Sequence, residues 1–555
     1  LAAAGMPLIT AGLGLLTGVG LIGLATRVTN MSNVAPDLAL MIGLGVGIDY
    51  SLFIVTRFRE NYAAFGDVER SVLEAMDTSG RAILLAGATV VIALLGMFAT
   101  GVAFMYGLAI AAVIAVLLTL AASLTLLPAL LSRFGPRLVR QSGPSRRRRG
   151  RQRGAANSDG AEIALAESRR PSWRGWSKTV KARPWPLGIA SLALMVALLI
   201  PVVAMRLDSS DAGNDPSSNT SRQAFDLLAQ GFGPGFNGPL LLVTQLPHRD
   251  DTAALPALRA LALSTPGVVA ATAPRIAPSG TVAVIEAYPD SAPQALKTTN
   301  LVNHLRDDVL PAFDRKTGLA VLVGGFTAGS IDFSNVLSNK LPLFFGIVIL
   351  LSALLLLLIF RSIVIPIQAA VMNVLTIGAA LGVTVAVFQD GVFASVLGVQ
   401  KGPIEAWIPV LMFAVVFGLS MDYEVFLISR VREKWMLRRD ASAAVGDGLA
   451  LTGRVITAAA AIMVCVFLSF TLGDERTLKE FGFGLAVAVF LDALVVRCML
   501  LPAFLELLGP VTWRLPRWLD ARLPHINIEG TTARALQDGN GTAPTPEPVA
   551  APAKS

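Results

Sequence analysis

Long apolar runs recur along the chain and are separated by polar segments. A helix that crosses a bilayer needs about 20 consecutive, mainly apolar residues. Ten runs approach that length, and we therefore predict ten membrane-spanning helices. They cover, approximately, residues 1–26, 37–56, 82–101, 104–131, 186–205, 341–360, 365–388, 407–429, 452–472 and 479–504.

One long segment, residues 206–340, breaks this pattern. Short runs with strand character alternate there with patterns that have the period of a helix. The predicted strands are 240–245, 267–272, 281–288 and 319–323, and the predicted helices are 252–264 and 293–313. The order β-α-β-β-α-β is that of a ferredoxin-like split βαβ unit. We therefore predict one α+β domain outside the membrane, between the fifth and the sixth span.

The chain contains one motif twice. Residues 47–60 and 420–433 each place an Asp-Tyr pair inside an apolar run that ends in Arg-x-Arg-Glu. The register of the repeat then holds without a gap through Gly80 and Gly453. A repeat of this size indicates one architectural unit that is used twice, so we look for the function at the paired carboxylates.

Basic residues concentrate in three segments between apolar runs, 57–81, 132–185 and 430–454. Cytoplasmic loops of membrane proteins carry an excess of Lys and Arg. Placing these three segments in the cytoplasm agrees with the count of crossings and puts 206–340 outside. Both Asp-Tyr helices then run from outside to inside, so the two halves are predicted to be parallel repeats.

These predictions divide the chain into six parts. They are an incomplete first transmembrane repeat of four spans at 1–131, an Arg-rich, disordered cytoplasmic linker at 132–185, a transmembrane helix at 186–205, an extracytoplasmic domain at 206–340, a second transmembrane repeat of five spans at 341–510, and a cytoplasmic tail at 511–555 that is disordered toward its end.

The first half of the repeat starts late. Residues 6–10 align with 372–376, so the chain begins at the counterpart of the span at 365–388. Nothing in the first half matches the preceding span, the α+β domain or the span at 341–360. We therefore expect an N-terminally truncated chain that lacks roughly 190 upstream residues, because a repeat protein needs complete repeats for stability.

Composition agrees with a membrane protein. Of the 555 residues, 54% are hydrophobic and 15% are charged, whereas soluble proteins carry about 25% charged residues. The net charge of +8 comes largely from basic loops such as 146–153, so positive-inside topology explains it and we predict no nucleic-acid partner. Cys465 and Cys498 both lie in apolar runs, which argues against a disulfide framework or a cysteine metal site.

The two aspartates of the motif are the strongest candidates for chemistry. A charge at mid-membrane costs about 2.5–3.5 kcal/mol, and Asp49 and Asp422 both sit at equivalent depths. The axis of the repeat should bring them together at the interface of the halves. Two buried carboxyls in one site can take up and release protons near neutral pH.

Each aspartate precedes a tyrosine, and adjacent residues on one helix do not face each other. We therefore predict that Tyr50 hydrogen-bonds Asp422 and that Tyr423 hydrogen-bonds Asp49, across the two helices. The alternative is a buried polar clasp that only fixes the register of the helices. All three histidines (His248, His304 and His525) lie outside the apolar runs, so no histidine can carry protons within the membrane.

Only the second half places charge in its last span. Asp492 and Arg497 align with Leu118 and Ser123 of the first half. Asp492 lies deep enough to join a proton path. The alternative is a structural pairing with a polar group on a neighbouring helix. We assign no role to Glu424, which lies two residues beyond the second aspartate of the motif and points elsewhere.

The two motifs, Gly-Ile-Asp-Tyr-Ser-Leu-Phe with Arg-Phe-Arg-Glu and Gly-Leu-Ser-Met-Asp-Tyr-Glu-Val-Phe-Leu with Ser-Arg-Val-Arg-Glu, resemble those of the MMPL family. These are mycobacterial membrane protein large transporters of the resistance-nodulation-division (RND) superfamily. Residues 232–239, Phe-Gly-Pro-Gly-Phe-Asn-Gly-Pro, are also similar to that family, and the resemblance covers about 1–510.

The resemblance implies an RND-type, α-helical polytopic fold of twelve spans and two exterior porter domains, of which ten spans and one porter domain would be present here. It implies proton-driven export of lipids or other hydrophobic compounds across the inner or plasma membrane. The proton relay of the family would be carried by Asp49, Tyr50, Asp422 and Tyr423.

Our hypothesis from the sequence is therefore a proton antiporter that exports an amphiphile. The alternative is a non-exporting protein of the same fold, such as a lipid sensor or a protein-secretion factor. No phosphate-binding loop, metal cluster or catalytic triad is recognisable, so we expect neither an enzyme nor a cofactor. The expected partners are a lipid or hydrophobic small molecule, protons and the membrane, and the sequence leaves a homo-oligomer open.

Overall fold

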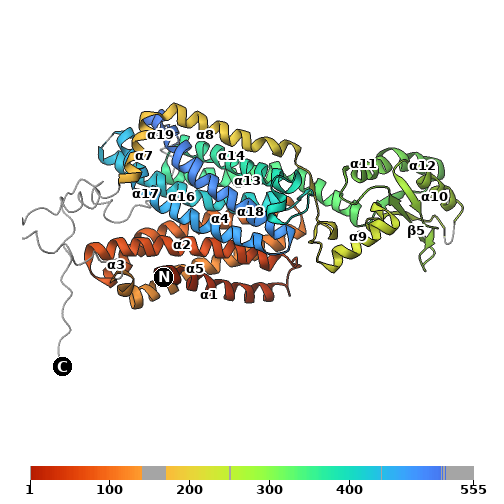
Figure 1. The fold of residues 1–555 in the computed structure, drawn as a ribbon, viewed down its shortest axis with the longest axis horizontal. Helices are drawn as coiled ribbons and strands as arrows, with labels where there is room; N and C mark the ends of the chain where they lie inside the picture. Colours follow the sequence, from red (N-terminus) through yellow and green to blue (C-terminus); the bar gives the residue numbers. More distant parts are fainter. Residues whose placement is uncertain are drawn as a thin grey trace, which may run out of the picture.

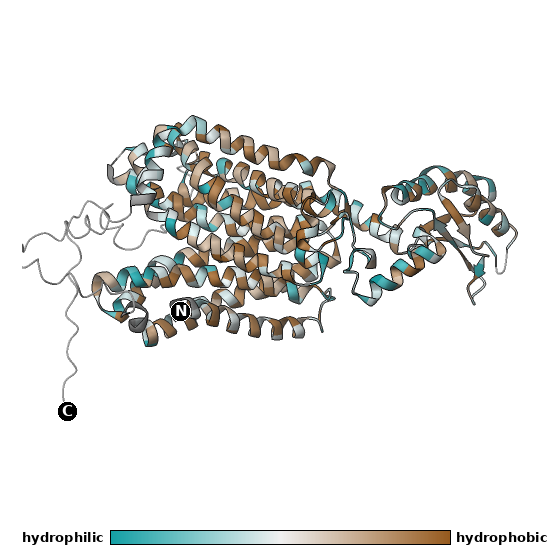
Figure 2. Ribbon diagram, in the orientation of Figure 1, coloured by the Kyte–Doolittle hydropathy of each residue, from teal (hydrophilic) through white to brown (hydrophobic). Residues whose placement is uncertain are grey.

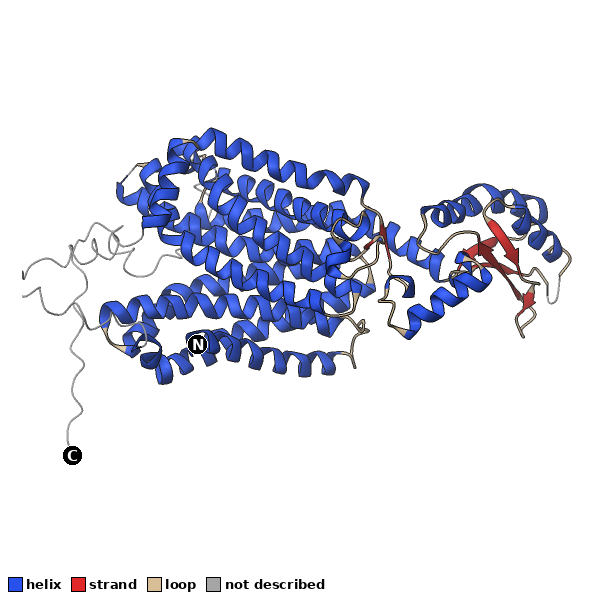
Figure 3. Ribbon diagram, in the orientation of Figure 1, coloured by secondary structure: helices blue, strands red, loops and turns tan. Residues whose placement is uncertain are grey.

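The computed structural model describes residues 2–140, 171–248, 252–438, 440–513, 515, 516 and 519. The molecule consists of a large bundle of helices and a smaller α+β domain (residues 209–325) that projects from one end of the bundle (Figure 1). Hydrophobic residues predominate along the helices of the bundle (Figure 2). Within the described ranges, strands lie in the α+β domain and at its junction with the bundle (Figure 3).

In the described part of the chain, ten helices are long and apolar enough to cross a membrane, which confirms the predicted number of spans. Five of them join more than one helical segment. In the two longest of these five, α3 (Val68–Ala75) and a π-helical turn lead into α4, and a π-helix (Leu491–Leu500) joins α18 to α19 (Leu501–Leu508). The main helices of the spans are α1 (Ala2–Ala25), α2 (Ala35–Phe65), α4 (Arg81–Leu95), α5 (Ala103–Arg140), α8 (Pro184–Leu199), α13 (Phe326–Phe360), α14 (Val364–Thr384), α16 (Ile408–Arg438), α17 (Ala441–Ser469) and α18 (Arg476–Phe490).

The predicted linker at 132–185 is wrong at both of its ends. Helix α5 continues to Arg140, and a separate helix, α7 (Pro171–Ala182), precedes α8. Residues 141–170 of the linker, and most of the predicted tail at 511–555, lie outside the described residues. Arg and Lys have high helix propensity, so a fall in hydropathy marks the edge of the membrane and not the end of the helix.

At two other boundaries a helix also continues beyond the apolar run. The basic segment 430–454 is helical almost throughout, since α16 ends at Arg438 and α17 begins at Ala441. Helix α13 begins at Phe326, inside the segment that the sequence assigns to the α+β domain, and continues without a break into its span. The α+β domain is therefore held to the bundle by a continuous helix.

The α+β domain contains an antiparallel sheet in the order β3-β5-β2-β6, with β4 also paired to β5. Its main strands are β2 (Leu240–Gln245), β3 (Val268–Ala271), β5 (Val282–Pro289) and β6 (Val321–Gly324), with the short β4 (Arg275–Ile276). Its core lies between the sheet and α10 (Leu255–Ser264), α11 (Leu296–His304) and α12 (Leu310–Thr317). The main elements follow the predicted order β-α-β-β-α-β; α9 (Thr220–Phe232) and β4 are additional.

A polar network lies where the α+β domain meets the bundle. Strand β1 (Leu207–Asp208) pairs in parallel with β7 (Ile404–Glu405), the strand that precedes α16. Arg476, the first residue of α18, donates from Nη1 to Glu480 Oε2 and to Ser210 Oγ, both at 3.1 Å. The side chains of Arg476 and Glu480 are only 3% and 0% exposed. A buried ion pair of this kind needs every donor satisfied, and backbone carbonyls of residues 402 and 403 accept from Nη2 of the same arginine.

Candidate functional site

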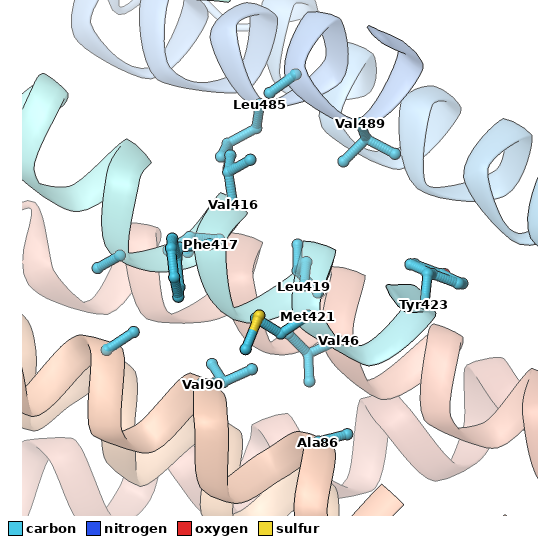
Figure 4. Packing of buried hydrophobic residues seen from close by; sticks show 14 of the residues in the cluster. Val46, Ala86, Val90, Val416, Phe417, Leu419, Met421, Tyr423, Leu485 and Val489 are labelled. Carbon is cyan, nitrogen blue, oxygen red and sulfur yellow. The ribbon is translucent and has the colours of Figure 1, made fainter. Parts of the chain in front are cut away.

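Glycines let the motif helices α2 and α16 approach the opposite half of the molecule. A Cβ added to Gly418 on α16 would lie 2.8 Å from Val90 Cα on α4, and a Cβ on the equivalent Gly45 on α2 would lie 2.6 Å from the ring of Phe467 on α17. Small residues allow such close helix contacts in membranes. Figure 4 shows side chains of α2, α4 and α18 gathered around α16.

The two motif helices also contact each other at equivalent positions. Phe53 on α2 and Phe426 on α16 occupy the same place in the repeat, and their ring centroids are 4.5 Å apart with the planes at 79°. Equivalent residues can touch only where the axis that relates the two halves passes between them. The Asp-Tyr pairs, one helical turn away, therefore lie beside this axis.

One half of the predicted cross-pairing is present. The Tyr423 hydroxyl on α16 donates a hydrogen bond to Asp49 Oδ1 on α2, and both side chains are buried. The same hydroxyl lies 3.9 Å from Met463 Sδ on α17. The contact joins the two repeats through a carboxyl that is removed from water.

The other predicted contact, between Tyr50 and Asp422, is present as a close approach. The two side chains interact, although the buried Tyr50 hydroxyl does not reach hydrogen-bond geometry. Asp422 Oδ1 instead accepts from Thr89 Oγ1 on α4 at 3.3 Å, while Asp422 Oδ2 is buried without a partner. The register of the repeat places Ile462 at the position of Thr89. The two aspartates therefore have different surroundings, although their motifs are alike.

A cavity of about 40 Å³ lies between α2, α4 and α16. All four residues of the Asp-Tyr cluster (Asp49, Tyr50, Asp422 and Tyr423) line it. The remaining lining residues are mainly apolar: Phe53, Ala82, Ile83, Leu85, Ala86, Thr89, Val425 and Phe426. Buried polar atoms normally form hydrogen bonds, so Tyr50 Oη and Asp422 Oδ2, which form none of standard geometry within the described residues, are exceptions beside this cavity.

A second polar cluster lies beside the first, between α16, α14 and the last span. Arg497 Nε donates to Asp492 Oδ2 at 2.7 Å, and Ser420 Oγ on α16 donates to Asp492 Oδ1 at 3.0 Å. Both charged residues belong to the π-helix, whose i to i+5 hydrogen bonding brings residues five positions apart together. The contact with Ser420 matches the alternative named above for Asp492, a structural pairing with a polar group on a neighbouring helix. The Arg497 guanidinium also lies 5.6 Å from the centre of the Tyr423 ring.

Sequence reasoning missed the burial of Glu424. This residue is 3% exposed, and its Oε1 has no hydrogen-bond partner in the described part of the chain. A signal was present in the repeat. In the first half, Ser51 and Ser123 form a hydrogen bond of 3.3 Å between α2 and α5, and the second half carries Glu424 and Arg497 at these two places. Where the first half has two hydrogen-bonded serines, the second half therefore has an acidic and a basic residue.

Metal-binding side chains are not clustered in the region that the structure covers. No group of three or more His, Cys, Asp or Glu side chains there could hold a metal ion. Cys465 and Cys498 are both free thiols. The polar groups buried in this part of the bundle include carboxyls, phenols and hydroxyls, which can accept hydrogen bonds, and the Arg497 guanidinium, which only donates them.

Comparison with known proteins identifies relatives over most of the chain. The sequence profile of the MMPL family matches residues 1–189 and 249–525. Membrane protein YdfJ of Bacillus subtilis is 35% identical over 95% of this chain and 70% of its own length. MmpL11 of Mycolicibacterium smegmatis, named a mycolic acid-containing lipids exporter, is 32% identical over 95% of this chain and 54% of its own length; the Mycobacterium tuberculosis protein of the same name is termed a heme uptake protein.

Among solved structures, SecDF from Thermus thermophilus, a translocon-associated membrane protein, superposes with a TM-score of 0.50 at 16% identity. The match covers 90% of this chain and 58% of that chain. It supports the fold alone. The chain spans about half of MmpL11 and of SecDF, and rather more of YdfJ.

Proposed function

Because the chain belongs to the MMPL family, we propose that it is part of a membrane transporter in which protons that cross the Asp-Tyr cluster drive the export of a lipid or another amphiphile. One observation supports this above the others. A cavity between the two repeats contains both motif aspartates, one held by the tyrosine of the opposite half and one with an unpartnered oxygen.

Protonation of such a site changes the contact between the halves. A protonated Asp49 accepts the Tyr423 hydroxyl less strongly, because hydrogen bonds to ionised groups are the stronger ones. A proton on Asp422 would give its free oxygen a hydrogen to donate toward the cavity. Uptake and release of protons therefore alter the balance between two arrangements of the repeats, which is the requirement for coupling to a conformational change.

The membrane potential would supply enough energy for transport against a concentration gradient. One charge that moves across 100 mV releases about 2.3 kcal/mol. We propose that the basic end of the bundle faces the cytoplasm and that the α+β domain lies outside, as the positive-inside rule indicates. Continuous α13 and the β1–β7 pairing would transmit movement of the bundle to that domain. A lipid substrate is suggested by the name of the MmpL11 relative.

The test is proton flux in proteoliposomes that contain the protein, followed with a pH-sensitive dye while lipids, hydrophobic drugs and heme are added. Asp49→Asn and Asp422→Asn should each abolish the flux that depends on an added compound. Asp37→Asn is the matched control, because Asp37 lies on α2 but is exposed and outside the cavity. Undiminished flux in both cluster variants would move the proton path elsewhere, and an absence of flux with every compound would favour a sensor or secretion factor.

A further inference from the structure

Helix α7 (Pro171–Ala182) lies against the end of the bundle that is distant from the α+β domain (Figure 1). One face of the helix is used for this contact. The Trp176 indole Nε1 donates to the Cys498 carbonyl at 2.8 Å, and Ser177 Oγ donates to the Gly446 carbonyl on α17 at 3.0 Å. Trp173 and Val180 occupy the same face, at the i, i+3, i+4, i+7 spacing of an amphipathic helix.

The closeness of the contact shows that α7 is docked firmly. A Cβ added to Gly453 on α17 would lie only 2.5 Å from Cε3 of Trp173. Val180 is buried. The helix is therefore part of the folded bundle, and its orientation fixes which residues point outward.

The outward side of α7 is basic. Lys178, Lys181 and Arg183, the residue that follows the helix, are all exposed. None of the three forms an ion pair with another residue in the described ranges. The other outward positions with described side chains, residues 175, 179 and 182, carry no charge. This surface consequently attracts anions without competition from its own acidic residues.

The depth of this basic surface matches the headgroup layer of a membrane. The next membrane span begins at Pro184, directly after Arg183, and Trp185 within its first turn is 65% exposed. Tryptophan is enriched at the interface between the hydrocarbon core and water. Gly453, on which Trp173 packs, is followed by Arg454 and then by a run without charged residues from 455 to 472. Two independent spans thus place α7 within one helical turn of the hydrocarbon boundary.

We propose that Lys178, Lys181 and Arg183 form a binding site for the phosphate groups of anionic phospholipids, with Trp185 in contact with the same lipids. The proposal follows from three properties that occur together: uncompensated positive charge, a fixed outward orientation and interfacial depth. It is independent of the transported compound and of the proton path. A phospholipid is preferred to a soluble phosphate because the site borders the hydrocarbon region.

The experiment uses the purified chain in vesicles of phosphatidylcholine with a minor fraction of phosphatidylglycerol. Spin-labelled phosphatidylglycerol and phosphatidylcholine report how strongly each lipid is immobilised at the protein surface. The triple variant Lys178→Gln/Lys181→Gln/Arg183→Gln should lose preference for phosphatidylglycerol, by up to roughly fivefold for each charge removed. High salt should weaken the preference of the wild type, because exposed charges are screened.

Matched controls distinguish the effect of this site from the effect of the protein's net charge. The variant Arg275→Gln/Arg315→Gln/Lys316→Gln removes three positive charges from exposed positions of the α+β domain and should keep the preference, as should Lys178→Arg/Lys181→Arg. An equal loss in both triple variants, or no loss in the α7 variant, would overturn the proposal. Competition by soluble glycerol phosphate at low concentration would also overturn it, since the site would then bind free phosphate.

A second measurement leaves the charges intact in case the triple variant does not fold. The fluorescence of Trp185 is obtained as the difference between the wild type and Trp185→Phe, and brominated phospholipids quench only indoles that they touch. Brominated phosphatidylglycerol should quench this difference signal more strongly than brominated phosphatidylcholine at equal mole fraction. Equal quenching by the two lipids would contradict a preference for anionic lipid beside α7.

Discussion

The hydroxyl of Tyr423 donates to the carboxyl of Asp49, whereas the hydroxyl of Tyr50 approaches Asp422 without reaching hydrogen-bond geometry. The two tyrosines occupy equivalent places in the repeat, so sequence alone gives no reason to treat them differently. The surroundings of the two aspartates also differ, because Thr89 donates to Asp422 whereas its counterpart in the repeat is the apolar Ile462. At the scale of single residues the cluster is therefore asymmetric, and equivalent substitutions should have unequal effects.

Replacing each tyrosine by phenylalanine tests this asymmetry. Tyr423→Phe leaves the buried carboxyl of Asp49 without its donor, and a hydrogen bond to a charged group contributes about 1.5–3 kcal/mol. Compound-dependent proton flux in proteoliposomes should therefore fall roughly tenfold or more. Tyr50→Phe removes a hydroxyl that approaches Asp422 without reaching hydrogen-bond geometry, and should reduce the flux less. Equal losses would show that Tyr50 and Tyr423 contribute alike during the cycle, contrary to the asymmetry described above.

The carboxyl of Glu405, at the junction between the bundle and the α+β domain, leads to a prediction of how the stability of the fold depends on pH. Burial raises the pKa of its carboxyl above the usual 4.5, and the charge of Asp208 adds to this, while the Ser210 hydrogen bonds and Arg476 oppose it. The folded state therefore holds this proton more tightly than the unfolded state. Its contribution to stability is complete below about pH 4.5 and is lost as the pH rises through the raised pKa.

The variant Glu405→Gln cannot lose that proton. Its thermal unfolding midpoint in detergent, compared with that of the wild type, should rise as the pH increases above about 4.5 and then level off. Glu475→Gln removes an exposed carboxylate at the start of α18 and serves as the control for a general loss of negative charge. A constant difference between Glu405→Gln and the wild type at all pH values would refute the assigned direction.

At the scale of elements, the positions of α2 and α16 depend on glycines that have no room for a side chain. Gly418→Ala would force its Cβ against the backbone of α4 at Val90, since the nearest atom is a Cα and cannot rotate away. Overpacking of this kind typically costs about 1–3 kcal/mol. The thermal stability of the protein in detergent should fall accordingly, and the cavity beside Asp422 should change shape.

Gly12→Ala on α1 is the control for this prediction. A Cβ on Gly12 would meet no atom within 4 Å, so the variant should be as stable as the wild type or slightly more stable, because alanine favours helices. A loss of stability in Gly12→Ala equal to that in Gly418→Ala would mean that backbone flexibility, and not close packing, explains the effect.

The helices and the site were not equally predictable. Hydropathy gives the ten spans because each apolar run is a local property of the sequence. The meeting of Asp49 and Tyr423 was also predictable, because an internal repeat implies an axis that brings equivalent helices together. The ends of α5, α13 and α16 were not, since helices continue beyond the apolar region wherever propensity and packing allow.

The contacts that distinguish the two halves depend on residues far apart in the chain. Thr89 and Asp422 are separated by 333 positions, and nothing in the pattern around either residue indicates the other. The burial of Glu424 likewise depends on the packing of α16 against neighbouring helices, which a single sequence does not specify. The repeat supplied the architecture, and tertiary packing decided which polar atoms found a partner.

At the scale of the whole molecule, the two repeats meet through equivalent elements, and the residues at their axis can be used to restrain them. Phe53 and Phe426 contact each other across this axis. If protons drive a movement of one half against the other, a covalent link between these positions should stop transport. The free thiols Cys465 and Cys498 would first be replaced by alanine, so that Phe53→Cys/Phe426→Cys carries the only reactive pair.

A short, reducible cross-linker applied to this double variant should abolish compound-dependent proton flux, and reduction should restore it in the same vesicles. Each single-cysteine variant treated with the same reagent should keep its flux, because one attached group does not join the halves. Comparison of each sample before and after reduction removes any effect of the lost phenyl rings. Full flux in the cross-linked protein would mean that the repeats remain fixed at their axis during transport, and coupling would then have to occur within one half, through elements such as the continuous α13.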